Sequence, residues 1–318
     1  MSPRSPSISV VIPVYNSQQL LRPLVARLEP VLEAMTPRHE LILVNDCSRD
    51  GSWQVIEELA REFPWIRGIH LMRNYGQHNA VLCGIRSATH ELVVTMDDDL
   101  QHPPEELPRL VETLGDDGDV VYGTPQHEQH GFMRDLASQV TKFTLQRAMS
   151  AETARNVSAL RVFRTQLRDG FANYRGQFVS IDVLLTWSTT RFKVIPVRHD
   201  PRKIGVSNYT VRKLFTHAMN MMTGFSTIPL QLASVVGFAF TLFGIAVLLL
   251  VLIRYMIVGS PVQGFPFLAS IIAIFSGAQL FALGIIGEYL ARMHFRMMDR
   301  PTYAVRATTG DSTQTGHS

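Results

Sequence analysis

Residues 91–114, ELVVTMDDDLQHPPEELPRLVETL, carry the pattern that decides the fold class. The apolar run at 92–96 predicts a buried strand, and residues 104–114 have the spacing of an amphipathic helix. Proline at the start of that helix is favourable, because its missing N–H would have no partner in the first turn. Between strand and helix lies an acidic turn, Asp97 to Asp99. The stretch therefore predicts a strand–turn–helix unit.

The same strand–turn–helix order occurs three times upstream. Strands are expected at residues 8–12, 40–44 and 67–71, followed by helices at 20–35, 53–63 and 78–87, and a fifth strand at 120–122. Strands that alternate with helices indicate an α/β fold, with a mostly parallel sheet covered by helices on both faces.

Polar residues follow each of the first four strands. Asn16 follows the first strand, Asp46 the second, Arg73 the third and Asp97 the fourth. Ligands of open parallel sheets bind outside the carboxyl ends of the strands. We therefore expect these four positions to gather at one edge and to form a binding site.

The acidic turn is a candidate metal site. In extended chain, Asp97 and Asp99 point to one side and Asp98 to the other. Two carboxylates on one side repel each other unless a cation lies between them. Hard ions such as Mg²⁺ or Mn²⁺ prefer oxygen ligands and bridge to substrate phosphates. We predict that Asp97, Asp99 and the amide of Gln101 bind such an ion, the alternative being a solvated acidic turn.

A second acidic loop follows the second strand, in VNDCSRDGS at 44–52. Asp46 can accept hydrogen bonds from a base or a ribose, whereas Asp50 is expected to be structural, in a turn or a helix cap. The sequence contains no GxGxxG, Walker A, HExxH or Cys/His zinc pattern. Dinucleotide oxidoreduction, P-loop hydrolysis and zinc chemistry are therefore disfavoured.

Charge is unevenly distributed along the chain. Charged residues make up 18% of the sequence, yet residues 230–290 contain only Arg254 and Glu288. Two uncharged apolar runs, 232–253 and 265–286, would each span roughly 33 Å as helices, enough for a bilayer core of about 30 Å. We expect a transmembrane hairpin, with buried core helices as the alternative. Because Lys and Arg are concentrated outside the linker, the positive-inside rule places both hairpin ends in the cytoplasm.

These observations give an expected domain organisation. A catalytic domain at 1–209 precedes an amphipathic segment at 210–229, the hairpin region at 230–290 and a cytoplasmic tail at 291–318. The amphipathic segment is expected to lie in the membrane interface, with a soluble helix as the alternative. No apolar leader precedes the first strand and only two cysteines occur, which favours the cytoplasmic (inner) membrane. A net charge of +3 argues against a nucleic-acid partner.

Several motifs together resemble family 2 glycosyltransferases with a GT-A fold. They are IPVYN at 12–16, VNDCSRDGS at 44–52, RNYGQHNAVLCG at 73–84 and MDDDLQHPPEE at 96–106. With RKIGVSNY at 202–209 and the hairpin, the chain more narrowly resembles the polyprenyl-phosphate glycosyltransferases, and the aminoarabinose transferases among them most closely.

The resemblance implies transfer of one sugar from a UDP- or GDP-linked nucleotide sugar to a membrane polyprenyl phosphate, such as undecaprenyl phosphate, with Mg²⁺ or Mn²⁺. By position, it also implies the site residues and a homotetramer. The nucleotide would be held by Pro13, Tyr15, Asn16, Asp46, Arg73 and Asp97, the metal by Asp99 and Gln101, and the acceptor phosphate by Arg134, Ser138, Arg202 and Ser207.

The chain departs from the family pattern around the nucleotide and the sugar. Asn45 and Cys47 replace the commoner Asp and Gly, Asp98 replaces a small residue, and Gly123 is followed by Thr124 instead of Arg. The identity of the donor sugar is therefore left open, whereas the predicted metal residues are intact.

Two other functions are left open by the sequence. A transferase acting on a sugar hydroxyl would need a general base, for which Asp182 is the candidate, unless that carboxylate is structural. A non-catalytic scaffold, or a subunit that moves lipid-linked sugar, would also use the hairpin. Such a protein would have no use for a metal site at Asp97, Asp99 and Gln101.

Overall fold

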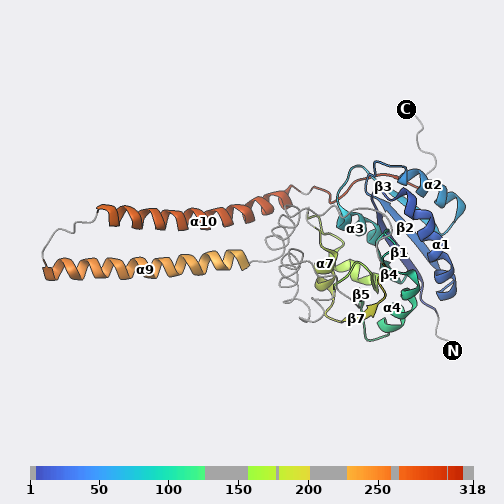
Figure 1. Cartoon of the computed structure of the whole chain (residues 1–318), viewed down its shortest axis with the longest axis horizontal. Coiled ribbons are helices and arrows are strands. Elements are labelled where there is room, and N and C mark those ends of the chain that lie inside the picture. The colour runs from blue at the N-terminus through green and yellow to red at the C-terminus, as the bar shows by residue number, and fades with distance from the viewer. Residues whose placement is uncertain are drawn as a thin grey trace. The chain divides into compact units, whose positions relative to one another are not determined.

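The computed structural model describes residues 5–125, 157–176, 179–200, 228–258, 265–298 and 300–310. The chain divides into two compact units. Met1–Phe215 and Arg300–Ser318 together form the first, here called the sheet unit, and Thr216–Asp299 forms the second, the hairpin unit (Figure 1). The sheet unit is therefore assembled from two parts of the chain, one on each side of the hairpin in sequence.

An eight-stranded mixed sheet forms the centre of the sheet unit. Its strands are β1 (Ile8–Val14), β2 (His39–Asn45), β3 (Ile66–Leu71), β4 (Leu92–Thr95), β5 (Val120–Pro125), β6 (Arg161–Arg164), β7 (Phe192–Val197) and β8 (Val305–Thr308). Their spatial order is β7-β5-β6-β4-β1-β2-β3-β8. Parallel pairs join β1 to β2 and β4, β2 to β3, and β5 to β7, whereas β6 and β8 run antiparallel to their neighbours.

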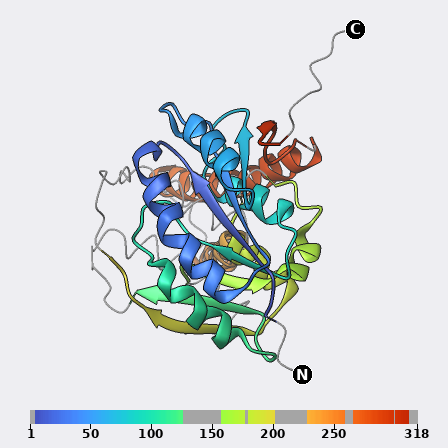
Figure 2. The ribbon, with the colours of Figure 1, turned by 90° about the vertical axis from the view of Figure 1, so that its right-hand side faces the viewer.

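Helices cover both faces of this sheet, because alternate residues of its central strands are apolar on both sides. One core cluster takes Val10 and Ile12 of β1, and the other takes Val11. The first cluster includes α1 (Gln18–Met35), α2 (Ser52–Glu62) and α4 (Leu107–Leu114), the last preceded by the short η1 (Pro104–Glu106) (Figure 2). The second includes α3 (Gln77–Ser87), η2 (Thr165–Phe171) and α7 (Ile181–Ser188).

The predicted α/β class and the four strand–helix units are confirmed. Each of the first four expected strands overlaps an observed one, and the fifth, expected at 120–122, continues to Pro125. Three strands were not predicted, namely β6, β7 and β8. The inserted β6 separates β4 from β5, so the sheet is mixed where a simple alternation of strands and helices would leave it parallel.

The segment after the hairpin differs from expectation, because it does not remain a separate tail. The second hairpin helix continues to Met297, and β8 then pairs with the outer side of β3. Ala304 accepts a hydrogen bond from the Met72 N–H at 2.9 Å, and the Arg306 guanidinium donates to the Met72 carbonyl at 3.1 Å. Residues 300–310 of the expected tail thus belong to the sheet unit.

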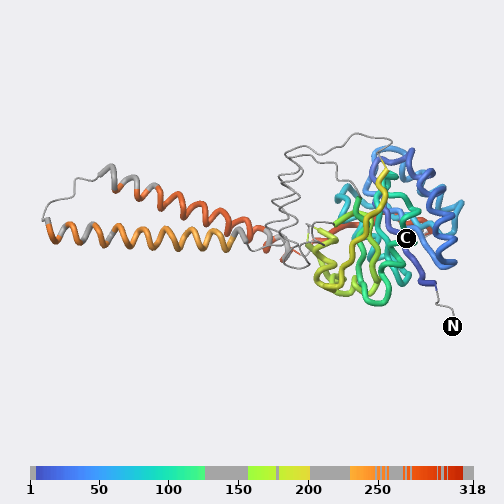
Figure 3. Tube along the Cα trace, turned by 60° about the horizontal axis from the view of Figure 1, so that its bottom comes forward, coloured from blue at the N-terminus to red at the C-terminus, as the bar shows by residue number. Residues whose placement is uncertain are grey.

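The hairpin unit contains two long helices, α9 (Ile228–Val258) and α10 (Phe265–Met297). Both are long and apolar enough to cross a membrane, with the most apolar windows at Leu230–Val247 and Ile274–Ala291. They lie side by side, and the rings of Phe240 and Phe275 meet edge to face at 5.8 Å between centroids (Figure 3). Both helices extend beyond the expected spans of 232–253 and 265–286.

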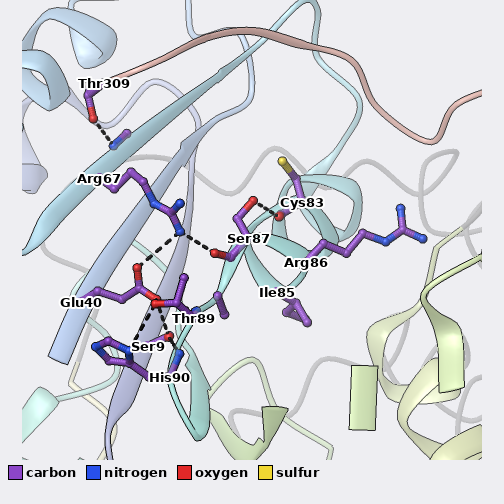
Figure 4. A network of polar contacts seen from close by, with 12 residues as sticks. Ser9, Glu40, Arg67, Cys83, Ile85, Arg86, Ser87, Thr89, His90 and Thr309 are labelled. Carbon is purple, nitrogen blue, oxygen red and sulfur yellow. Dashed lines mark hydrogen bonds and ion pairs between the residues drawn. The ribbon is translucent and has the colours of Figure 1, made fainter. Parts of the chain in front are cut away.

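At the amino ends of the strands, a network centred on Glu40 joins β1, β2 and β3 to the segment between α3 and β4 (Figure 4). One carboxylate oxygen of Glu40 accepts hydrogen bonds from the Ser9 hydroxyl and from the N–H and hydroxyl of Thr89, each at 2.7 Å. The other accepts from Arg67 at 3.3 Å. Burial would raise the pKa of Glu40, but these hydrogen bonds and the Arg67 charge outweigh it and hold the pKa below its usual value. The cost of burying the Glu40 charge is therefore offset by its hydrogen bonds and by Arg67.

Candidate active site

The opposite, carboxyl edge of the sheet holds most of the strained backbone of the sheet unit. Among the described residues, the only non-glycine residues with positive φ are Asn16, Cys47 and Leu100, and they follow β1, β2 and β4. After β3, Gly76 has a φ of 90°. Left-handed backbone is unfavourable for side chains with a Cβ and persists where the surroundings enforce it, commonly at functional sites. The predicted convergence of four loops is confirmed.

The loops after β1 and β2 hold each other in place. The Asn16 N–H donates to the Ser48 hydroxyl at 3.0 Å, and the Asn16 side-chain oxygen accepts from the Arg49 N–H at 2.8 Å. Asp50 accepts from the N–H groups of Gln18 and Ser52, both at 3.1 Å. The structural role expected for Asp50 is therefore confirmed. Asn16, predicted as nucleotide-binding, joins the two loops through both its backbone N–H and its side-chain oxygen.

Asp46 joins the second loop to the third. It is 2% exposed, and its two carboxylate oxygens accept from the N–H groups of Tyr75 and Gly76 at 2.7 and 2.8 Å. Burial raises the pKa of Asp46 in spite of these two hydrogen bonds. The carboxylate predicted to contact the nucleotide thus also fixes the loop that carries Arg73.

The acidic loop after β4 accepts hydrogen bonds from two neighbouring segments. The side-chain amide of Gln77, the first residue of α3, donates to Asp97 at 2.6 Å. Asp98 accepts from the Tyr15 N–H, in the loop after β1, at 3.4 Å. Asp97 and Asp98 therefore have different partners, on α3 and in the loop after β1. Asp99 instead accepts from the Gln101 N–H at 3.1 Å, within the loop itself.

The electrostatics of this loop favour a cation. Burial raises the pKa of Asp97 to about 7, and the charges of Asp99 and Asp98 act in the same direction. Burial also raises the pKa of Asp98 to about 6, against hydrogen bonds from Ser17 and Tyr15. Carboxylates that raise one another's pKa are stabilised in the charged form when a positive ion joins them.

The oxygen donors of this loop fit a divalent metal that also binds phosphate. Within the described ranges, no group of three or more His, Cys, Asp and Glu residues is placed to enclose an ion. Mg²⁺, however, is usually bound through one or two carboxylates together with substrate phosphates, without a cage made wholly of protein. Asp97, Asp99 and the Gln101 amide are chemically suited to such a partial set.

Three other predicted nucleotide residues lie on the elements that lead to this edge. Pro13 is a buried residue of β1, paired in register with Val44. Tyr15 is 42% exposed. The exposed Arg73 stacks on its near neighbour Tyr75, with 4.7 Å between the guanidinium carbon and the ring centroid. An exposed aromatic side chain and a stacked guanidinium can both contact a planar or anionic ligand.

Asp182, the candidate general base, is held by structural partners. It is 8% exposed on α7, and its Oδ1 accepts from the Tyr122 hydroxyl at 3.0 Å and from the Arg161 guanidinium. Arg161 is itself 4% exposed and also donates to the Thr95 hydroxyl at 3.0 Å. A carboxylate paired in this way is poorly suited to take a proton from a substrate. The structural reading of Asp182 is therefore favoured.

The predicted acceptor-phosphate residues, Arg134, Ser138, Arg202 and Ser207, lie outside the described residues. The same holds for residues 210–227 of the expected interfacial segment, whereas residues 228–229 begin α9. The structure therefore describes the donor side of the predicted site.

Two residues of the site were not predicted from sequence. Gln77 lies within the RNYGQH motif, and its position at the first turn of a helix could have indicated a contact with the acidic loop. Arg161 lies in the unpredicted β6, where a charged residue between apolar neighbours, LRVF at 160–163, was the available signal.

Comparison with known proteins shows which family this chain resembles. Residues 9–171 match the family described as glycosyl transferase family 2. The undecaprenyl-phosphate 4-deoxy-4-formamido-L-arabinose transferase of Sodalis glossinidius (strain morsitans) is 35% identical over 309 residues, which cover 96% of this chain and 94% of that protein. The protein of the same name from Proteus mirabilis (strain HI4320) is 34% identical over 306 residues, covering 95% and 94%.

Among solved structures, similarity is found to glucosyl-3-phosphoglycerate synthase from Mycobacterium tuberculosis, determined with Mn²⁺, uridine-diphosphate-glucose and phosphoglyceric acid. It is 17% identical, the match covers 69% of this chain and 78% of that one, and the TM-score is 0.46.

Proposed function

The chain belongs to glycosyl transferase family 2, and we propose that it transfers one sugar from a nucleotide sugar to the phosphate of a membrane polyprenol. Undecaprenyl phosphate is the proposed acceptor, because the relatives that match nearly the whole chain are named for it. A 4-deoxy-4-formamido pentose is the first donor sugar to test for the same reason. Asn45, Cys47 and the run after Gly123 depart from the family pattern at positions proposed to lie near the donor, so other sugars belong in the same test.

The pairing of Asp182 is the observation that carries the choice of acceptor. A hydroxyl acceptor must lose a proton to a base, whereas a phosphate monoester is already an anion near neutral pH, with a second pKa of about 6. An oxygen of this phosphate forms a bond to the anomeric carbon as the bond from that carbon to the donor diphosphate breaks. The leaving nucleoside diphosphate keeps the bonding electron pair. No proton transfer is required, which agrees with an Asp182 that is engaged by Tyr122 and Arg161.

Asp97, Asp99 and Gln101 would hold a divalent ion together with the donor diphosphate. When bound, such an ion supplies Lewis-acid stabilisation of the charge that develops on the leaving group. Gln77 orients Asp97, and the Tyr15 N–H orients Asp98. The pKa of Asp97 is raised first by burial and then by its acidic neighbours, and a bound cation would lower it.

The nucleotide would lie across the other strand ends. Pro13 lies near the end of the first strand. Tyr15 and Asn16 follow that strand, Asp46 follows the second and Arg73 the third. We propose that Asp46 and Tyr15 hold the base and ribose, and that Arg73 faces the diphosphate. The hydrogen bonds from Tyr75 and Gly76 to Asp46 would fix the loop that carries Arg73 relative to Asp46.

The acceptor would approach from the membrane. Arg134, Ser138, Arg202 and Ser207 are proposed to hold its phosphate, with residues 210–229 in the interface. We propose that the chain crosses the inner membrane twice, with the sheet unit on the cytoplasmic side. The pairing of β8 with β3 supports this topology, because it returns the chain after the hairpin to the unit that precedes it. A homotetramer is also proposed, to be tested by the native mass of the detergent-solubilised protein.

The decisive experiment incubates the purified full chain in detergent with undecaprenyl phosphate, a panel of UDP- and GDP-linked sugars, and Mg²⁺ or Mn²⁺. Mass spectrometry of the lipid fraction is expected to show one added sugar for one donor of the panel. Undecaprenol without its phosphate is the matched control and is expected to remain unmodified. Formation of product only with a lipid-linked saccharide would contradict the proposal.

The same assay separates the competing functions. Loss of a general base typically lowers the rate by about 10²–10⁴. Asp182→Asn is expected to lower it by less than about tenfold, since the amide can keep a hydrogen bond to Arg161. A larger loss with unchanged donor binding would favour a hydroxyl acceptor. Equal donor consumption by the natural protein and Asp99→Ala would contradict the proposed metal site, whereas no metal-dependent consumption by the natural protein would favour a non-catalytic membrane protein.

A further inference from the structure

A buried guanidinium lies beside the acidic loop, and the reaction described above leaves it without a role. Arg161 is paired in register with Thr95, the last residue of β4, and with Tyr122 of β5. It is 4% exposed, and its Nε donates to the Thr95 hydroxyl at 3.0 Å. Thr95 precedes Asp97 by two residues. The central strand β6 thus places a cation next to the strand end that carries the acids.

Arg161 and Asp97 lie toward the same face of the sheet. Side chains two residues apart on a strand share a face, and so do register partners on adjacent strands. Val93 and its partner Phe163 belong to the core cluster of α3 and α7, while Met96 belongs to the opposite one. Asp97 bonds to Gln77 of α3, which confirms its side. The charge of Arg161 accordingly lowers the pKa of Asp97, against the larger effects of burial and of Asp99.

The guanidinium is held rigidly in this position. Asp182 and the Thr95 hydroxyl both accept hydrogen bonds from it, and the Tyr122 hydroxyl donates to the same oxygen of Asp182 at 3.0 Å. A buried ion pair is costly to desolvate, and an apolar replacement is often equally stable. Stability alone is therefore a weak reason for a charged group here, whereas a fixed charge next to a cation and a diphosphate has a direct electrostatic effect.

We propose that Arg161 is a positioning residue of the donor site, whose fixed charge beneath Asp97 balances the binding of the metal against that of the diphosphate. Asp182 would set the strength of this charge by pairing with it. The proposal rests on the proposed function insofar as a metal and a diphosphate meet at this edge. Arg161 lowers the affinity of the free acidic loop for a cation and raises its affinity for an anion. The metal is then retained well only when the diphosphate accompanies it.

The sign of two effects tests this role. In Arg161→Gln, Mn²⁺ alone is expected to bind about three- to tenfold more tightly, and UDP or GDP in EDTA about three- to tenfold more weakly; tenfold corresponds to about 1.4 kcal/mol. Asp182→Asn instead removes the negative charge that pairs with Arg161. Mn²⁺ is therefore expected to bind more weakly and the nucleotide more tightly. Mn²⁺ is measured by electron paramagnetic resonance and nucleotides by calorimetry, on the full chain in detergent.

Two control variants separate charge from folding. Arg161→Lys keeps the positive charge and is expected to restore both affinities to within about twofold of the natural protein. Arg67→Gln removes a partly buried cation from the opposite edge of the sheet. It is expected to lower thermal stability while leaving both affinities unchanged. A loss of structure would weaken both ligands together.

The proposal is overturned if Mn²⁺ alone binds Arg161→Gln no more tightly than the natural protein, or if Arg161→Gln and Asp182→Asn shift the two affinities in the same direction. These outcomes are independent of the acceptor. If no sugar is transferred to undecaprenyl phosphate but the opposite shifts are seen, the proposed function fails and the role of Arg161 stands.

Discussion

The two edges of one sheet carry opposite electrostatics on the same strands. At the amino edge, Glu40 accepts hydrogen bonds from Ser9 and Thr89 and pairs with Arg67, so its pKa falls below the usual value. At the carboxyl edge, burial and neighbouring acids raise the pKa of Asp97 to about 7. The carboxylate at the first edge is paired within the protein, whereas the second edge is where we propose that a divalent ion binds. The paired network and the proposed site thus lie at opposite ends of the same strands.

The largest effect expected from this contrast follows Asp99→Ala. It removes an oxygen ligand proposed for the metal, so sugar transfer should fall by about 10²–10³, equivalent to about 2.7–4 kcal/mol in the barrier. The thermal midpoint should not fall, because the change relieves repulsion between acids. Turnover and thermal unfolding of the same preparation check both parts. Nearly unchanged turnover would show that Asp99 is not part of the metal site.

Ligand addition is the next effect in size. A ligand that binds only the folded state, at a free concentration 100 times its Kd, stabilises by about 2.7 kcal/mol. Mn²⁺ with UDP or GDP should therefore raise the thermal midpoint of the natural protein by several degrees and that of Asp99→Ala by much less. An equal rise in both would place the ion elsewhere.

Glu40→Gln tests the amino edge. Loss of its charged hydrogen bonds should lower the free energy of unfolding by about 1–3 kcal/mol, with turnover per folded molecule preserved. Because the pKa of Glu40 is lowered in the folded state, its contribution is present above the unfolded value of about 4.3 and is lost as the pH falls through the folded value. The difference in the free energy of unfolding between Glu40→Gln and the natural protein should therefore become smaller at acidic pH. A loss of turnover without a loss of stability would break the separation of the two edges.

The smallest effect is expected on the surface. Arg22 pairs with Glu58 at 2.8 Å and Glu62 at 2.9 Å, but these side chains are about half exposed. Solvent screening makes such pairs weak. Arg22→Ala should leave both the thermal midpoint and turnover unchanged within error, and thus gives the baseline for the other variants. A clear drop in the midpoint would show that α1 and α2 depend on this pair.

The parts of this contrast that were predictable are those with strong local patterns. The apolar runs of β1 to β4 and the polar residues after them indicate the sheet, its carboxyl edge and the acidic site. Asp50 was separable from Asp46 because a DG pair marks a turn. Local periodicity of this kind depends on neighbouring residues alone.

The missed elements depend on distant partners. β6 begins and ends with an arginine, and β8 is mostly exposed, so neither shows the apolar run that marks β4. The partner of Asp182 lies on β6 and that of β3 lies beyond the hairpin. A charged residue such as Arg161 is unexpected in an inner strand, because its partner Asp182 is far from it in the sequence. Pairing of this kind is a property of the assembled sheet.

The position of β8 also sets an order of events during synthesis. Arg306 follows Met72, its partner, by 234 residues. At about 5–20 residues per second, roughly 10–50 s pass between their emergence, and both hairpin helices are made in that interval. Until then the outer edge of β3 has unpaired N–H and C=O groups, which can pair with another chain. A ribosome that stalls within the hairpin would therefore leave a nascent protein whose sheet is open to aggregation, although every residue of the donor side has already been made.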